Sequence, residues 1–197
     1  MKEKKTFKVA KKTPPKSLGG KIANTLNNDT TVELRSINPA ATWQAMKAQA
    51  VARGFMADKG YDLMCSCSFI TPPPLVKQDD GTMEPRPGVK LLNWIEKSIE
   101  SDDRRQQVMR VSAKTAPDKL ASSIVHVLKE GKDVVLKIIG APACWNSAKA
   151  LSIARGFLED KPDGLIYIPG FITPTPVIAG VERTGLKLTV RLLDQEE

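Results

Sequence analysis

The segment ATWQAMKAQAVARGF, from Ala41 to Phe55, returns as ACWNSAKALSIARGF, from Ala143 to Phe157. Shifting the 197-residue chain by 102 positions extends this match without a gap from Val9 to Val76, and about 26 of those 68 positions are identical. Chance would give only a few identities. The chain is therefore predicted to contain one domain twice. Beyond the Pro-rich segment the offset falls to 97, so copy one carries about five extra residues there.

Each copy predicts the element order β-α-β-α-β-β. Pro15 and Pro117 stand where a first helical turn tolerates proline, and Leu18, Ile22 and Leu26 form a stripe with helical spacing. The predicted elements of copy one are a strand at 7–11, a helix at 15–27, a strand at 32–37, a helix ending near 55, and strands at 63–70 and 89–95. Those of copy two are a strand at 109–113, a helix at 117–130, a strand at 134–139, a helix ending near 157, and strands at 165–172 and 186–193. A long Pro-rich tip joins the last two strands of each copy.

These elements define an α+β fold with domains at 1–95 and 108–197, joined by a polar connector at 96–107. The two copies are expected to pack as a pseudo-dimer within one chain. On one face of the second helix of each copy, a tryptophan is followed by small residues. This pattern would let another helix pack closely against that face. The residues of this expected interface are Trp43, Ala50, Gly54, Trp145, Ser152 and Gly156. Two alternatives remain open: each tryptophan fills the edge of its own core, or it stacks on a nucleobase.

The charge is concentrated at the beginning of the chain. The net charge is +8, and residues 1–21 hold eight lysines against one glutamate. Such a segment either keeps the chain soluble or attracts phosphate. No apolar run is long enough to span a membrane, and the charged beginning does not resemble a secretion signal. Three cysteines, an odd number, favour a reducing compartment over a disulfide framework. We therefore expect a cytoplasmic protein with no membrane partner.

The residues that usually carry catalysis are sparse. Cys65 and Cys67 lie two apart on a predicted strand, and the second copy has Tyr167 and Pro169 in their places. His126 is the only histidine, which makes a Ser-His or Cys-His nucleophile pair improbable. Neither copy offers a carboxylate pair or a set of metal ligands. We expect no catalytic residue, no metal, no cofactor and no enzymatic activity.

Copy two carries the segments RVSAKTAP, AKALSIARGF, IPGF and GVERTGLKLTV, and these closely resemble the stage V sporulation protein S family. Copy one keeps KVAKKTPP and MKAQAVARGF but has QDDGTMEPRP, at 78–87, in place of the segment with E-R-T. The resemblance implies the Alba-like superfamily, whose members are small basic dimers that bind DNA or RNA. Their contacts come from the loop after the first strand and from the hairpin between the last two strands. On this chain the implied nucleic-acid-binding residues are Lys8, Lys11, Lys12, Lys16, Arg86, Lys90, Lys114, Lys119, Arg183 and Lys187.

These observations together favour a non-enzymatic regulatory protein that binds DNA or RNA and is associated with the nucleoid. Two alternatives stay open. The same scaffold could bind protein as a regulatory or structural module without nucleic acid. It could also hold a small anionic ligand, such as a nucleotide, between the copies. Self-association of chains is also left open. The acidic Asp79 and Asp80 at the hairpin tip of copy one weaken the nucleic-acid hypothesis at that place.

Overall fold

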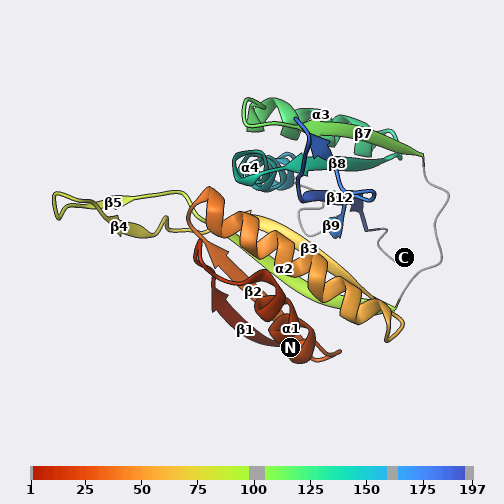
Figure 1. The fold of residues 1–197 in the computed structure, drawn as a ribbon, viewed down its shortest axis with the longest axis horizontal. Helices are drawn as coiled ribbons and strands as arrows, with labels where there is room; N and C mark the ends of the chain where they lie inside the picture. Colours follow the sequence, from red (N-terminus) through yellow and green to blue (C-terminus); the bar gives the residue numbers. More distant parts are fainter. Residues whose placement is uncertain (1, 98–104, 159–163, 194–197) are drawn as a thin grey trace.

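The computed structural model describes residues 2–97, 105–158 and 164–193, and both copies in it have the predicted element order, with two additional short strands between the last two predicted strands (Figure 1). The elements of copy one are β1 (Glu3–Lys8), α1 (Pro15–Thr25), β2 (Thr30–Ser36), α2 (Pro39–Ala57), β3 (Tyr61–Phe69), β4 (Leu75–Lys77), β5 (Met83–Pro85) and β6 (Val89–Lys97). Those of copy two are β7 (Gln106–Val111), α3 (Pro117–Lys129), β8 (Asp133–Ile139), α4 (Ala141–Phe157), β9 (Leu165–Phe171), β10 (Val177–Ile178), β11 (Val181–Glu182) and β12 (Gly185–Leu192).

The helices begin and pack where the sequence favours them. Proline stands in the first turn of each helix, where the missing N–H costs no hydrogen bond. The side chain of Asn38 caps α2 by accepting from the backbone N–H of Ala41 at 2.9 Å. At Gly19, α1 approaches α2 so closely that an added Cβ would lie 2.7 Å from the Val51 side chain. Gly19 therefore serves helix packing, whereas a Cβ atom on Gly20 would meet nothing within 4 Å.

The two copies share one eight-stranded sheet in the order β1-β2-β6-β3-β9-β12-β8-β7. In each half the outer pair is parallel and the remaining pairs are antiparallel. At the centre, β3 pairs with β9 through a single residue pair, Cys65 and Tyr167. The strand order of one half mirrors that of the other, so the copies form the expected intrachain pseudo-dimer.

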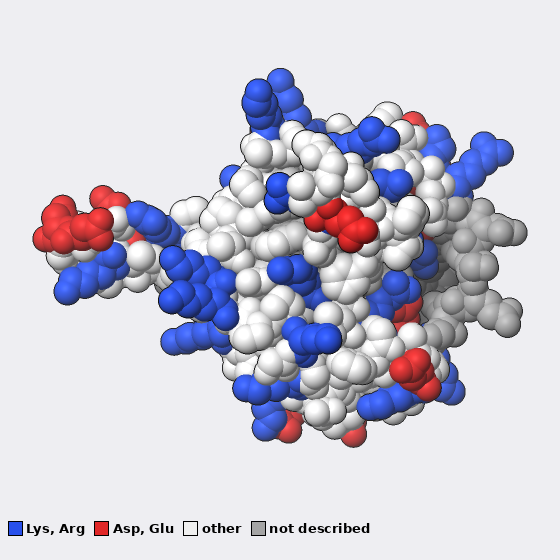
Figure 2. Space-filling model, in the orientation of Figure 1, with Lys and Arg blue, Asp and Glu red and all other residues white. Residues whose placement is uncertain are grey.

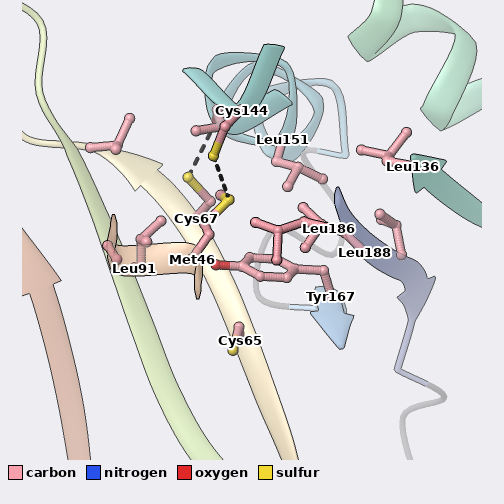
Figure 3. Packing of buried hydrophobic residues seen from close by; sticks show 14 of the residues in the cluster. Met46, Cys65, Cys67, Leu91, Leu136, Cys144, Leu151, Tyr167, Leu186 and Leu188 are labelled. Carbon is pink, nitrogen blue, oxygen red and sulfur yellow. Dashed lines mark hydrogen bonds between the residues drawn. The ribbon is translucent and has the colours of Figure 1, made fainter. Parts of the chain in front are cut away.

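The core is continuous across the junction between the copies (Figure 3). Helix α2 packs against α4 and β9, and α4 packs against β3. The thiol of Cys144 on α4 donates to the sulfur of Met46 on α2 at 3.3 Å. The thiol of Cys67 on β3 donates to the backbone carbonyl of Ala148 on α4 at 3.3 Å. Each copy therefore completes the core of the other.

The predicted first strand of each copy is displaced by two to four residues from the observed one. We predicted strands at 7–11 and 109–113, whereas β1 covers Glu3–Lys8 and β7 covers Gln106–Val111. Both are edge strands that are mostly exposed, so they lack the apolar pattern by which a buried strand is found. The predicted connector at 96–107 is occupied at both ends by strands, since β6 continues to Lys97 and β7 starts at Gln106. Residues 98–104 lie outside the described residues, and the domain limits stay a prediction.

The Pro-rich tip of each copy forms a second small hairpin. In copy one β4 pairs with β5, and in copy two β10 pairs with β11. We call these hairpins, at 71–87 and 173–184, the arms. The arm of copy one projects away from the body (Figure 1). No helix in the described part of the chain is long and apolar enough to cross a membrane.

Candidate functional site

The loop after the first strand has the same structure in both copies. In copy one the backbone N–H of Ala10 donates to the hydroxyl of Thr13, and in copy two the N–H of Ser112 donates to the hydroxyl of Thr115, both at 2.9 Å. This tight turn leaves its lysines facing water. The predicted lysines of this region are all exposed: Lys11, Lys12, Lys16, Lys114 and Lys119.

Three cations lie directly beside one another across the strands of each half-sheet. In copy one Lys8 on β1 is opposite Arg35 on β2, which is opposite Lys90 on β6. In copy two the equivalent row on β7, β8 and β12 consists of Arg110, Lys137 and Lys187. The residues beside them in the strands point to the core, so the rows lie on the sheet face without helices. We call them the cationic rows.

The rows join the loops and the arms into one basic surface per copy. Strand β1 ends at Lys8, three residues before Lys11, and β6 begins immediately after the arm that carries Arg86. In copy two Arg183 lies between β11 and β12 in the same way. The guanidinium of Arg86 donates to the side-chain carbonyl of Gln78 at 2.7 Å, within the arm. Loop, row and arm are therefore contiguous in each copy.

Sequence reasoning named Lys8, Lys90 and Lys187 but missed the other three members of the rows. The signal for Arg35, Arg110 and Lys137 was present in the repeat, because all three row positions are basic in both copies. Like charges opposite each other on neighbouring strands destabilise a sheet. Arg35 is compensated by an ion pair of 2.5 Å with the buried Glu33.

The charge of the copy-one arm differs from that of the sheet. Figure 2 shows acidic side chains gathered at the tip of this arm, with basic side chains nearer the body. Asp79, Asp80 and Glu84 are all exposed there. The side chain of Asp80 accepts hydrogen bonds from the backbone and hydroxyl of Thr82, which lower its pKa. The basic surface of copy one therefore ends before the tip.

The tryptophans of the expected interface are half-buried against the shared core. The ammonium of Lys47 lies 5.3 Å from the ring centre of Trp43, and that of Lys149 lies 5.8 Å from the ring centre of Trp145. Burial lowers the pKa of Lys47. One face of each ring is thus occupied by the protein's own cation, which leaves less room for a nucleobase.

The small residues of that interface divide into two groups. Ala50 and Ser152 are buried, and the Ser152 hydroxyl lies 3.3 Å from the Cys67 thiol of the other copy. Gly54 and Gly156 are exposed, and a Cβ atom on either would meet nothing within 4 Å. The expectation that these glycines permit close helix approach is wrong, because the helices meet nearer their beginnings, at Met46 and Cys144.

One arginine of each long helix, Arg53 on α2 and Arg155 on α4, lies at the junction of the copies. Arg53 forms a two-pronged ion pair with Asp62, at 2.6 and 3.1 Å, and also donates to the backbone carbonyl of Pro169 in copy two at 3.4 Å. Its side chain is half-buried. The position equivalent to Asp62 in copy two is Gly164, so Arg155 is oriented by other contacts.

The groups considered for redox or metal chemistry are poorly suited to it. Cys65, Cys67 and Cys144 are free thiols, all fully buried. Burial raises the pKa of Cys67 to about 12 and raises those of the other two as well, so the reactive thiolate is disfavoured. His126 is exposed beside Glu130, 3.2 Å away. No group of three potential metal ligands occurs among the described residues.

The strand order and the paired basic surfaces define two Alba-like domains joined as a pseudo-dimer. The family model of stage V sporulation protein S (SpoVS) matches the chain twice, at residues 5–85 and 107–193. The chain therefore belongs to the SpoVS family and is a tandem duplication of its domain. Membership implies a regulatory role related to sporulation.

Proposed function

We propose that this chain is a non-enzymatic regulator that binds DNA or RNA through the two basic surfaces formed by loops, cationic rows and arms. The observation that carries the proposal is the recurrence of three adjacent cations in both half-sheets. A fold gains no stability from like charges placed opposite one another, whereas a polyanion neutralises them and releases its counterions. The association with the nucleoid expected from the sequence follows from the same chemistry.

A salt-dependent shift assay on the full chain tests this function. Lys8→Gln/Lys12→Gln removes one row cation and one loop cation, neither of which forms an ion pair among the described residues. Lys59→Gln/Lys129→Gln removes the same charge from exposed positions outside the rows, loops and arms. We expect the first pair to flatten the salt dependence by about two units and the control pair to change it little. Equal effects, or no binding at low salt, would reject the proposal.

The arms favour a second candidate function, binding to another protein. Several of the exposed large hydrophobic residues lie on them: Leu75, Met83, Val177, Ile178 and Val181. Apolar side chains on a projecting hairpin suit a protein partner. Separate variants that substitute these apolar residues and the loop lysines test this hypothesis. It is favoured over nucleic-acid binding if neither variant changes the affinity for nucleic acid.

A further inference from the structure

A hollow of about 240 Å³ lies on the helix-free face of the sheet, where copy one meets copy two. Its lining among the described residues consists of Lys4, Glu33, Ser66, Ser68, Lys90, Leu92 and Arg155. All except Arg155 come from strands of copy one. The alternation of side chains along β3 shows on which face of the sheet the hollow lies. Cys67 points to α4, so its neighbours Ser66 and Ser68 point to the opposite face.

The polar groups of the hollow suit an anion. Glu33 is its only carboxylate among the described residues, and that group is already bound by Lys4 at 3.2 Å and by Arg35 at 2.5 Å. Lys90 forms no ion pair within the described part of the chain, and the hydroxyls of Ser66 and Ser68 form no hydrogen bond there. With the carboxylate neutralised, the hollow offers cationic groups and two free hydroxyl donors.

The same place in copy two is built differently, although the backbone is repeated. Ile168 and Gly170 stand where copy one has Ser66 and Ser68, and Val135 stands where it has Glu33. Ile168 is buried in a small apolar cluster with Met64 and Ile166. The hydroxyl and carboxylate groups that line the hollow therefore have no counterparts at these positions of copy two, whereas both halves have a cationic row.

We propose that this hollow binds a phosphate group, held by Lys90 and Arg155 and by the hydroxyls of Ser66 and Ser68. Cationic nitrogen donors form the stronger hydrogen bonds to phosphate, and hydroxyls complete its oxygen shell. The phosphate belongs either to a free nucleotide or to a nucleic-acid backbone that crosses the sheet. Because Arg155 comes from copy two, the site exists only while the copies are joined. It shares Lys90 with the cationic row of copy one and uses neither the loops nor the arms.

Calorimetric titration of the full chain with a nucleoside monophosphate and with inorganic phosphate tests the site. Lys90→Gln removes a cation from the hollow, and Lys129→Gln removes one from an exposed position outside the hollow, the rows, the loops and the arms. We expect Lys90→Gln to weaken binding about tenfold or more, as loss of a charge-assisted hydrogen bond does, and Lys129→Gln to leave it unchanged. Equal effects of the two substitutions would overturn the proposal.

A second set of variants separates the two phosphate sources. Ser68→Ala and Ser66→Ile leave the charge unchanged, and Ser66→Ile installs the residue that copy two has; melting temperatures verify folding. If the mononucleotide binds and these variants abolish binding, the source is a free nucleotide. If only an oligonucleotide binds and Ser68→Ala weakens it severalfold, the source is the nucleic-acid backbone. If no phosphate ligand responds to either variant, the proposal is wrong, whatever the loop lysines do.

Discussion

At the scale of single residues, the junction contains a buried chain of hydrogen bonds that links the two copies and occurs once, without a symmetric counterpart. The hydroxyl of Tyr167 in copy two donates to the side-chain carbonyl of Gln49 in copy one at 2.9 Å. The amide of Gln49 then donates to the side chain of Asn93 at 2.6 Å. Leu151 and Val190 stand at the positions of copy two that are equivalent to Gln49 and Asn93, so copy two cannot form the symmetric counterpart of this chain.

Tyr167→Phe should therefore destabilise the fold. It leaves the buried carbonyl of Gln49 without its donor, which costs about 1–3 kcal/mol. Urea unfolding measures the loss. Tyr61→Phe is the matched control, because Tyr61 is half-buried and its hydroxyl makes no hydrogen bond among the described residues. Equal stability of Tyr167→Phe and the parent chain would show that the junction does not need this bond.

Glu33 should make the fold sensitive to acid. Burial acts to raise the pKa of this carboxyl, but hydrogen bonds from Arg35 and Lys4 outweigh it, so the pKa lies below its ordinary value of 4.5. A carboxyl whose pKa is lowered by folding stabilises the protein above its unfolded pKa, and this contribution is lost as the pH falls through the folded pKa. The free energy of unfolding should drop below about pH 4.5.

Urea titrations between pH 7 and 3 provide the measurement. Glu33→Gln should flatten the acid dependence, and the same change at the exposed Glu84 should not. A parent chain and a Glu33→Gln variant with parallel pH profiles would assign the acid sensitivity to other groups.

At the scale of the elements, the sequence predicted the interior better than the edges. The helix beginnings at Pro15 and Pro117 were predicted correctly, because proline and the apolar stripe are local signals. The edge strands β1 and β7 were displaced, since most of their side chains face water and carry no apolar pattern. The row cations Arg35 and Lys137 were missed for a related reason: only the register between strands brings them beside Lys90 and Lys187.

The acidic tip of the copy-one arm should oppose binding of nucleic acid. Asp79→Asn/Glu84→Gln removes two negative charges and keeps the turn, which depends on Asp80 and Thr82. We expect affinity for nucleic acid to rise severalfold at low salt and the gain to fade at high salt, as screening shortens the reach of the charges. Shift assays at two salt concentrations check this. Unchanged affinity would mean that this tip stays away from phosphate.

At the scale of the whole molecule, the two copies should contribute unequally to nucleic-acid binding. Residues 1–21 hold eight lysines and one glutamate, whereas 103–123 hold five basic and two acidic residues. Neutralising Lys11, Lys12 and Lys16 should weaken binding and flatten its salt dependence more than neutralising Lys114 and Lys119. Titrations at several salt concentrations compare the two sets per charge removed. A larger effect per charge from the second set would reverse the assignment.

The single residue pair between the half-sheets, Cys65 with Tyr167, has an evolutionary consequence. In a symmetric dimer a residue on the twofold axis meets its own copy, and every mutation arrives on both sides at once. Fusing the copies into one chain ended that constraint. A small residue now faces a large one, and each half can inherit changes that the other never receives. Because the two domains are covalently linked, they are always present in equal amounts. The halves can therefore diverge in sequence without having to associate as separate chains.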